Sequence, residues 1–237
     1  MIKKVLFILI QFCLFHLLVA QTNSTGSWNI LNLSYNHNEK LGFFGEGQIR
    51  SLKFYENFHY YEYKFGINLK VHPSFKLTLA GGSYQTYREG GNFILPKNNN
   101  EIRIWPQFTL SQSIQKLKIE QRYRTEFRFT SNGYRTRFRY RFGVSYPFGK
   151  SSKGYQPFHI NISDEIFFTD RQPYFERNRF QFALNMKVSV RSTIQAGFLT
   201  QFDYKINDET GRAFFVIGYY YEIIKKKITE SNPTVND

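Results

Sequence analysis

Apolar and polar residues alternate along most of the chain, and three segments show the alternation most fully. In residues 60–71 every second side chain is apolar, and the positions between them are mostly polar. Residues 117–130 and 134–146 repeat the pattern, with Lys, Arg and Glu at most of the polar positions. Because successive side chains of a strand point to opposite faces, each segment predicts a β-strand with one apolar and one charged face.

Weaker alternation predicts eight more strands, so the chain after Ala20 is expected to be all-β. They lie at residues 27–36, 41–53, 75–87, 101–112, 158–169, 177–190, 194–206 and 212–223. Many of these segments exceed the five or six residues usual for globular strands and match the roughly 9 to 11 residues that cross a bilayer at a tilt. Turn residues such as Asn132 and Gly133 separate them. The pattern predicts an antiparallel up-and-down β-barrel.

The surroundings of the apolar face decide between two kinds of barrel. A soluble periplasmic lipocalin-like binding barrel would turn that face inward. In a membrane the face would meet lipid and the charged face would line a closed lumen, since only a closed barrel satisfies every strand amide in hydrocarbon. Strand length and aromatic residues near strand ends favour the membrane. Those aromatic residues are Trp28, Tyr87, Tyr146, Tyr174 and the run at 219–221.

The number of strands is expected to lie between ten and twelve. The segmentation gives eleven, whereas single-chain bacterial barrels normally have an even number. The longer connection at 88–100 is expected outside the cell, which would start strand 27–36 outside as well. We therefore expect ten strands if that segment does not span, or twelve if one strand has been overlooked.

The first residues indicate export to the bacterial outer membrane. Lys3 and Lys4 precede an apolar run at 5–18, and Ala20 offers a cleavage position, which predicts a signal peptide at 1–20. The apolar run is shorter than the roughly 20 residues of a membrane helix. The barrel is expected at 21–224 and a polar tail at 225–237. The single cysteine, Cys13, lies in the signal, so the exported chain has no disulfide.

Charge and aromatic content sharpen the picture of the lumen. The net charge is +14, and 19% of the residues are aromatic. Basic and acidic residues share the polar face of the predicted strands, which predicts an ion-pair network inside the barrel. Its expected members are Glu101, Arg103, Glu120, Arg122, Arg124, Glu126, Arg128, Arg135, Arg137, Arg139, Arg141, Glu165, Arg177 and Arg179.

Two interpretations of this network stay open. It either fills the lumen as a packed set of ion pairs or attracts anions into a narrow path. Packing is favoured, because barrels of about eight strands are filled by side chains and open channels appear nearer sixteen.

Catalytic chemistry is less expected than a structural role. His159, Ser163 and Glu165 share one strand face and would suit a lipid-modifying outer-membrane hydrolase, but a structural polar cluster explains them as well. No cofactor or metal motif occurs, so no catalytic residue, metal or cofactor is assigned. Nucleic acid is not expected as a partner, since the chain is exported and carries no binding motif. The expected partners are outer-membrane lipid and lipopolysaccharide.

Several motifs, taken in order, resemble one bacterial family, the domain of unknown function 2490. They are Gly-Ser-Trp at 26–28, Gln-Ile-Arg at 48–50, Gly-Gly-Ser-Tyr at 81–84, and the strands at 101–107, 121–128, 135–141, 164–167 and 176–179. The resemblance implies an outer-membrane location in Gram-negative bacteria and brings no known reaction or ligand. We expect a non-enzymatic outer-membrane barrel that is either a structural or interaction element or a narrow anion-preferring pore.

Overall fold

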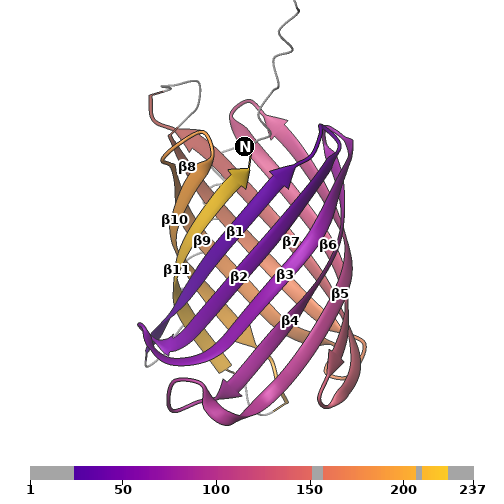
Figure 1. Ribbon diagram of the computed structural model, residues 1–237, viewed down its shortest axis with the longest axis vertical. Helices are drawn as coiled ribbons and strands as arrows, with labels where there is room; N and C mark the ends of the chain where they lie inside the picture. The colour runs from indigo at the N-terminus through magenta and orange to yellow at the C-terminus, as the bar shows by residue number, and fades with distance from the viewer. Residues whose placement is uncertain (1–23, 151–156, 207–209, 224–237) are drawn as a thin grey trace, which may run out of the picture.

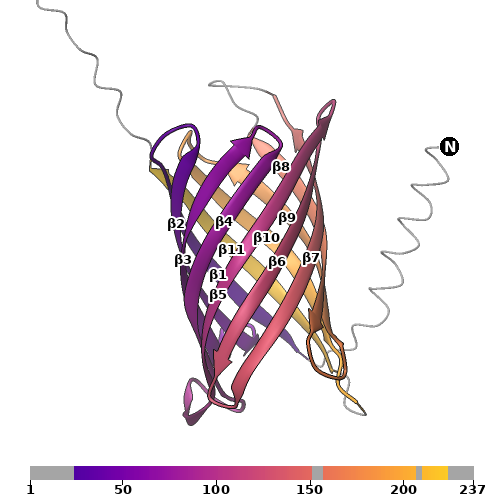
Figure 2. The same cartoon turned by 90° about the vertical axis from the view of Figure 1, so that its right-hand side faces the viewer.

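The computed structural model describes residues 24–150, 157–206 and 210–223, and these ranges form one closed β-barrel (Figures 1 and 2). The described residues contain no helix suited to crossing a membrane. The expected signal peptide at 1–20 and the tail at 225–237 lie outside the described residues. The predicted all-β barrel is confirmed.

Eleven strands make up the barrel, each paired with its neighbours in the chain. They are β1 (Thr25–Asn36), β2 (Leu41–Lys53), β3 (Glu56–His72), β4 (Phe75–Arg88), β5 (Ile94–Ile114), β6 (Leu117–Thr130), β7 (Gly133–Phe148), β8 (Phe158–Thr169), β9 (Phe175–Lys187), β10 (Ser192–Asp203) and β11 (Thr210–Ile223). Sequence-based bounds agree within a few residues except at the start of β5, which begins well before residue 101.

The barrel closes through a parallel pair, which corrects the expectation of a wholly antiparallel sheet. β1 runs beside β11 in the same direction, from Thr25 opposite Ala213 to Tyr35 opposite Ile223. An odd number of up-and-down strands brings the first and last strands into the same direction, and parallel hydrogen bonds then complete the sheet and leave no edge. Eleven lies within the expected range of ten to twelve, but the preference for an even number was wrong, because β1 is a full strand that pairs with both β2 and β11.

The two ends of the barrel carry different connections. We call the end of the barrel at which β1 begins the N-end, and the end at which β11 finishes the C-end. The N-end holds Ser24 and the connections at 54–55, 89–93, 131–132, 170–174 and 204–209. The C-end holds Ile223 and the connections at 37–40, 73–74, 115–116, 149–157 and 188–191. The longest interval between successive strands is therefore 149–157, and the expectation of a long connection at 88–100 was wrong. Most of that segment joins the sheet, since Ile94 pairs with Arg88 and Phe93 donates its amide to Phe58 O at 2.7 Å.

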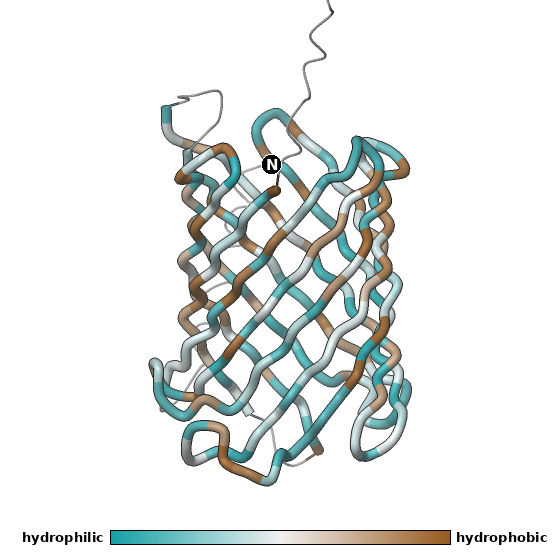
Figure 3. Tube along the Cα trace, viewed as in Figure 1, coloured by the Kyte–Doolittle hydropathy of each residue, from teal (hydrophilic) through white to brown (hydrophobic). Residues whose placement is uncertain are grey.

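The outer surface is apolar over the length of the strands. Phe65, Leu79, Phe138 and many similar side chains are exposed there, and Figure 3 shows the alternation of polar and apolar positions along each strand. Tyr146, Tyr174 and Tyr219 are also exposed, as expected for outward aromatic residues.

Two of the aromatic residues expected near an outer interface point inward instead, and a third, Tyr87, is buried beside Phe93. Trp28 is buried against Phe214 in the lumen, and Tyr220 lines the cavity. Both belong to the inward parity of their strands, since Trp28 lies opposite Arg50 and Tyr220 lies opposite Thr193. The position of an aromatic residue near a strand end does not by itself reveal which face it occupies.

Candidate functional site

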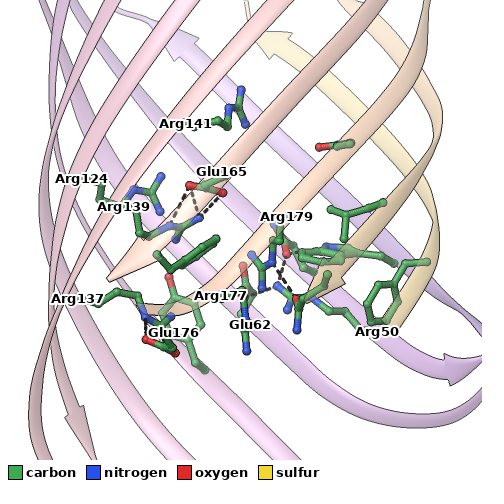
Figure 4. Close-up of a pocket in the computed structure, with 18 of the residues that line it drawn as sticks. Arg50, Glu62, Arg124, Arg137, Arg139, Arg141, Glu165, Glu176, Arg177 and Arg179 are labelled. Carbon is green, nitrogen blue, oxygen red and sulfur yellow. Dashed lines mark hydrogen bonds and ion pairs between the residues drawn. The ribbon is translucent and has the colours of Figure 1, made fainter. Parts of the chain in front are cut away.

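The lumen is the candidate site, because the inward faces of all eleven strands converge there. It contains a cavity of about 1260 Å³, and arginine and lysine outnumber aspartate and glutamate about two to one among the residues that line it. Figure 4 shows charged side chains that line the cavity at several heights, among them Arg139 with Glu165 and Arg137 with Glu176. Charges removed from water need partners or a ligand, so the identity of each partner decides what the lumen can do.

Glu126 on β6 is the most enclosed carboxylate of the network. Its side chain is 0% exposed and one oxygen accepts a 2.5 Å hydrogen bond from Arg139 Nη1. Arg124 lies at 3.4 Å, Arg137 at 3.6 Å and Arg103 at 3.7 Å. The register explains the convergence, because Arg137 lies opposite Glu126 and Arg139 lies opposite Arg124.

Glu165 on β8 forms the second anchor. Arg139 donates to both of its oxygens, at 3.0 and 2.9 Å, and Arg122 Nη2 donates at 2.6 Å. Two parallel N–H bonds to one carboxylate fix both direction and distance, which makes such pairs among the strongest polar contacts in proteins. Arg139 thus bridges Glu126 and Glu165.

A third group lies nearer the N-end. Glu101 accepts two hydrogen bonds from Arg103, at 2.8 and 3.0 Å, and is also paired with Arg128. Glu176 accepts from Arg137 Nε at 2.8 Å and lies 3.6 Å from Arg128. Arg128 and Arg137 therefore connect this group to the one around Glu126.

Aromatic rings complete the filling of the lumen at this level. Phe167 is 0% exposed, with the guanidinium groups of Arg139 and Arg179 at 4.5 and 4.9 Å from its ring centre. Arg179 also lies 4.9 Å from the ring of Trp28, which joins β9 to β1 across two intervening strands. Cations over ring faces are attracted by the ring quadrupole.

We call this level the waist. It is defined by Trp28, Trp105, Glu126, Arg139, Phe167 and Arg179. Trp105 is 1% exposed and packs under the guanidinium of Arg124 at 5.0 Å. At the waist, buried side chains project into the lumen and border the cavity.

The structure brings all of the predicted network residues except Arg135 and Arg179 into ion pairs. Arg177 is paired with Asp203, and Arg141 lies 3.5 Å from Glu120. Arg179 donates to Gln201 at 2.8 Å and has no carboxylate within ion-pair distance among the described residues. Arg135 is exposed near the N-end and makes no ion pair in the described ranges.

Sequence reasoning missed several members of the network. Arg50 is bonded to Glu62 at 2.9 Å, Lys64 lies 2.7 Å from Glu62, and Lys64 also reaches Glu46. The alternation in residues 60–71 already placed Glu62 and Lys64 on the polar face. The register that sets Arg50 opposite Tyr60 was needed to pair them.

The residues considered for hydrolysis do not assemble into a catalytic group. Four positions separate His159 from Ser163 along β8, about 13 Å at the usual rise of a strand. Glu165 is fully engaged by Arg122 and Arg139. Within the described ranges, no group of three or more His, Cys, Asp or Glu is arranged to hold a metal ion.

The fold and the lumen define the class: a closed eleven-stranded β-barrel with an apolar exterior and an interior of arginine, glutamate and aromatic side chains. The chain belongs to the family described as Protein of unknown function (DUF2490), whose model matches residues 25–212. No curated protein and no solved structure matches the chain.

Proposed function

We propose that this chain is a non-enzymatic barrel of the bacterial outer membrane whose lumen is closed by the waist, so that it works as a structural or interaction element. The burial of Glu126 among four arginines on the inner wall of the barrel carries the proposal. A solute path would need those side chains to part, and separating a buried charge pair costs about 3 to 5 kcal/mol.

The apolar exterior supports the membrane location. Large apolar side chains are exposed on every side of the barrel, including Leu31, Phe65, Ile104, Phe142 and Phe182. Soluble monomers rarely expose contiguous apolar patches of this extent, while a closed barrel satisfies its backbone without water. The export signal predicted at 1–20 agrees with this location.

The connections support an orientation in which the C-end faces outward. Outer-membrane barrels have short periplasmic turns and longer external loops, and the longest connection here, 149–157, lies at the C-end. This orientation places the start of β1 in the periplasm, where an exported chain arrives. The C-end connections carry Lys40, Lys116 and Arg191, which suit contact with the phosphates of lipopolysaccharide.

A narrow anion-preferring pore is the second candidate. The basic surplus among the cavity-lining residues favours it, since a confined positive potential concentrates anions. The two candidates differ at the waist, which must open for the pore and stay closed for the structural role.

Membrane fractionation and liposome swelling test the proposal together. We expect the protein in the outer-membrane fraction, with a gel mobility in detergent that changes on heating, as folded barrels show. Vesicles that contain it should swell in neutral sugars no faster than empty vesicles. A soluble periplasmic monomer would refute the membrane location, and rapid swelling would refute the closed lumen.

A further inference from the structure

The C-end mouth of the lumen carries a group of cations with few acidic partners. Lys76, Thr109, Arg122 and Arg141 lie opposite one another in turn across β4, β5, β6 and β7, so their side chains share one row of the inner wall. Lys118 lies four positions before Arg122 on β6, about 13 Å nearer the mouth, opposite Ser145. Four positive side chains are thus collected on one side of the mouth.

The acids nearby do not neutralise this group. Glu165 is shared between Arg122 and Arg139. Glu120 reaches only Arg141, and the distance of 3.5 Å is at the limit of a hydrogen bond. The side chains of Lys76 and Lys118 make no ion pair or hydrogen bond among the described residues.

Unused hydrogen-bonding atoms lie on the same wall. Arg122 Nε is buried and donates to no acceptor. A buried donor without a partner costs about 1 to 3 kcal/mol, which a bound acceptor would recover. Asn161 Oδ1 is buried and accepts no hydrogen bond, and Asn161 lies opposite Ser145 on the neighbouring strand. The first atom suits an anion and the second suits a hydroxyl group.

The two arginines of this group are less exposed than the two lysines. Lys76 and Lys118 are exposed, the Arg141 side chain is 32% exposed, and the Arg122 side chain is 14% exposed. Beyond Arg122 the wall reaches Arg139 at the waist. An anion that passes from the lysines to the arginines therefore meets increasingly desolvated cationic groups, where electrostatic attraction is strongest.

We propose that this mouth binds a soluble phosphate ester that carries hydroxyl groups, with the phosphate between Arg122 and Arg141 and a hydroxyl donating to Asn161. Arginine suits this role, because its planar donor fork matches the oxygens of a phosphate. Lys76 and Lys118 attract the anion at the entrance. The inference rests on the proposed function only in requiring a lumen that is open to water at the C-end.

The site can be tested by isothermal titration calorimetry of the refolded full chain in an uncharged detergent. The ligands are a hexose monophosphate, inorganic phosphate and chloride, all at one ionic strength. We expect one hexose monophosphate per chain, weaker binding of phosphate, and no saturable binding of chloride.

Variants locate the site. Arg141→Gln should weaken hexose monophosphate binding about tenfold or more, as expected for the loss of a charge-assisted bond. Arg135→Gln is the matched control, since it removes the same charge from the same strand about 20 Å away and should change affinity less than about twofold. Asn161→Ala should weaken the hexose monophosphate and leave inorganic phosphate unchanged.

Three results would overturn the proposal: no saturable binding, equal loss in Arg141→Gln and Arg135→Gln, or chloride binding as tightly as phosphate. Heat-dependent gel mobility of each variant shows whether it is folded. Binding by a protein recovered outside the membrane would refute the proposed location and leave the site intact, so the two ideas fail separately.

Discussion

Removing the charge of Glu126 should destabilise the barrel much more than removing the charge of Glu120. Glu126→Gln keeps the size of the side chain and leaves Arg103, Arg124, Arg137 and Arg139 facing one another at the waist. Breaking a buried ion pair typically costs about 3 to 5 kcal/mol.

The expected magnitude follows from the partners that the arginines retain. Arg139 keeps Glu165, and Arg103 keeps Glu101. Arg124 keeps only the neutral Gln107, at 2.6 and 2.8 Å. Because three of the four arginines still have a carboxylate, with Glu176 serving Arg137, we expect the lower end of the range, about 3 kcal/mol.

Urea unfolding in lipid vesicles measures this difference through tryptophan fluorescence. Trp28 and Trp105 are the only two tryptophans, and both lie in the lumen. Glu120→Gln is the control, since its side chain is 30% exposed and its one ion pair is 3.5 Å long, so it should cost at most about 1 kcal/mol. Equal stability of Glu126→Gln and the wild type, or equal losses in both variants, would refute the reasoning.

Three further predictions concern the wall and the orientation. Phe138→Arg, on the outer face of β7, should lower the free energy of unfolding in vesicles by about 2 to 4 kcal/mol, and an unchanged value would contradict a lipid-exposed position. Gly66→Val should lower the free energy of unfolding by about 1 to 3 kcal/mol through overpacking, because a Cβ there would lie 2.4 Å from the Phe44 ring. Gly47→Ala is the control and should be neutral, since a Cβ there meets no atom within 4 Å; equal unfolding free energies of the two variants would contradict this. The thiol of Ser189→Cys should react with an impermeant maleimide in intact cells, and the thiol of Asn132→Cys should react only after permeabilisation. The reverse pattern would show that the barrel has the opposite orientation.

The strands were predictable from local pattern because each one carries its own alternation. The bounds of β2, β6 and β8 agree with the predicted segments at both ends. The early start of β5 was not predictable, since Pro96 and the Asn run at 98–100 favour a turn. Tertiary contacts of Phe93 with Phe58 and Tyr87 hold that segment against the sheet.

Features that depend on the whole sheet could not be predicted from the local pattern of apolar and polar residues. The parallel seam depends on how many strands close the ring, and no residue of β1 or β11 signals it. The arginine-rich face was predictable from the parity of β6 and β7, while the pairing of Arg139 with both Glu126 and Glu165 depends on the register of three strands. The inward position of Trp28 likewise follows from register.

Conductance in a planar lipid bilayer tests the central claim most directly. The wild-type barrel should insert and give no steady current if the waist closes the lumen as proposed. Phe167→Gly, which removes the fully buried ring at that level, should give discrete current steps with a preference for anions. A steady wild-type current equal to that of the variant would contradict a closed lumen.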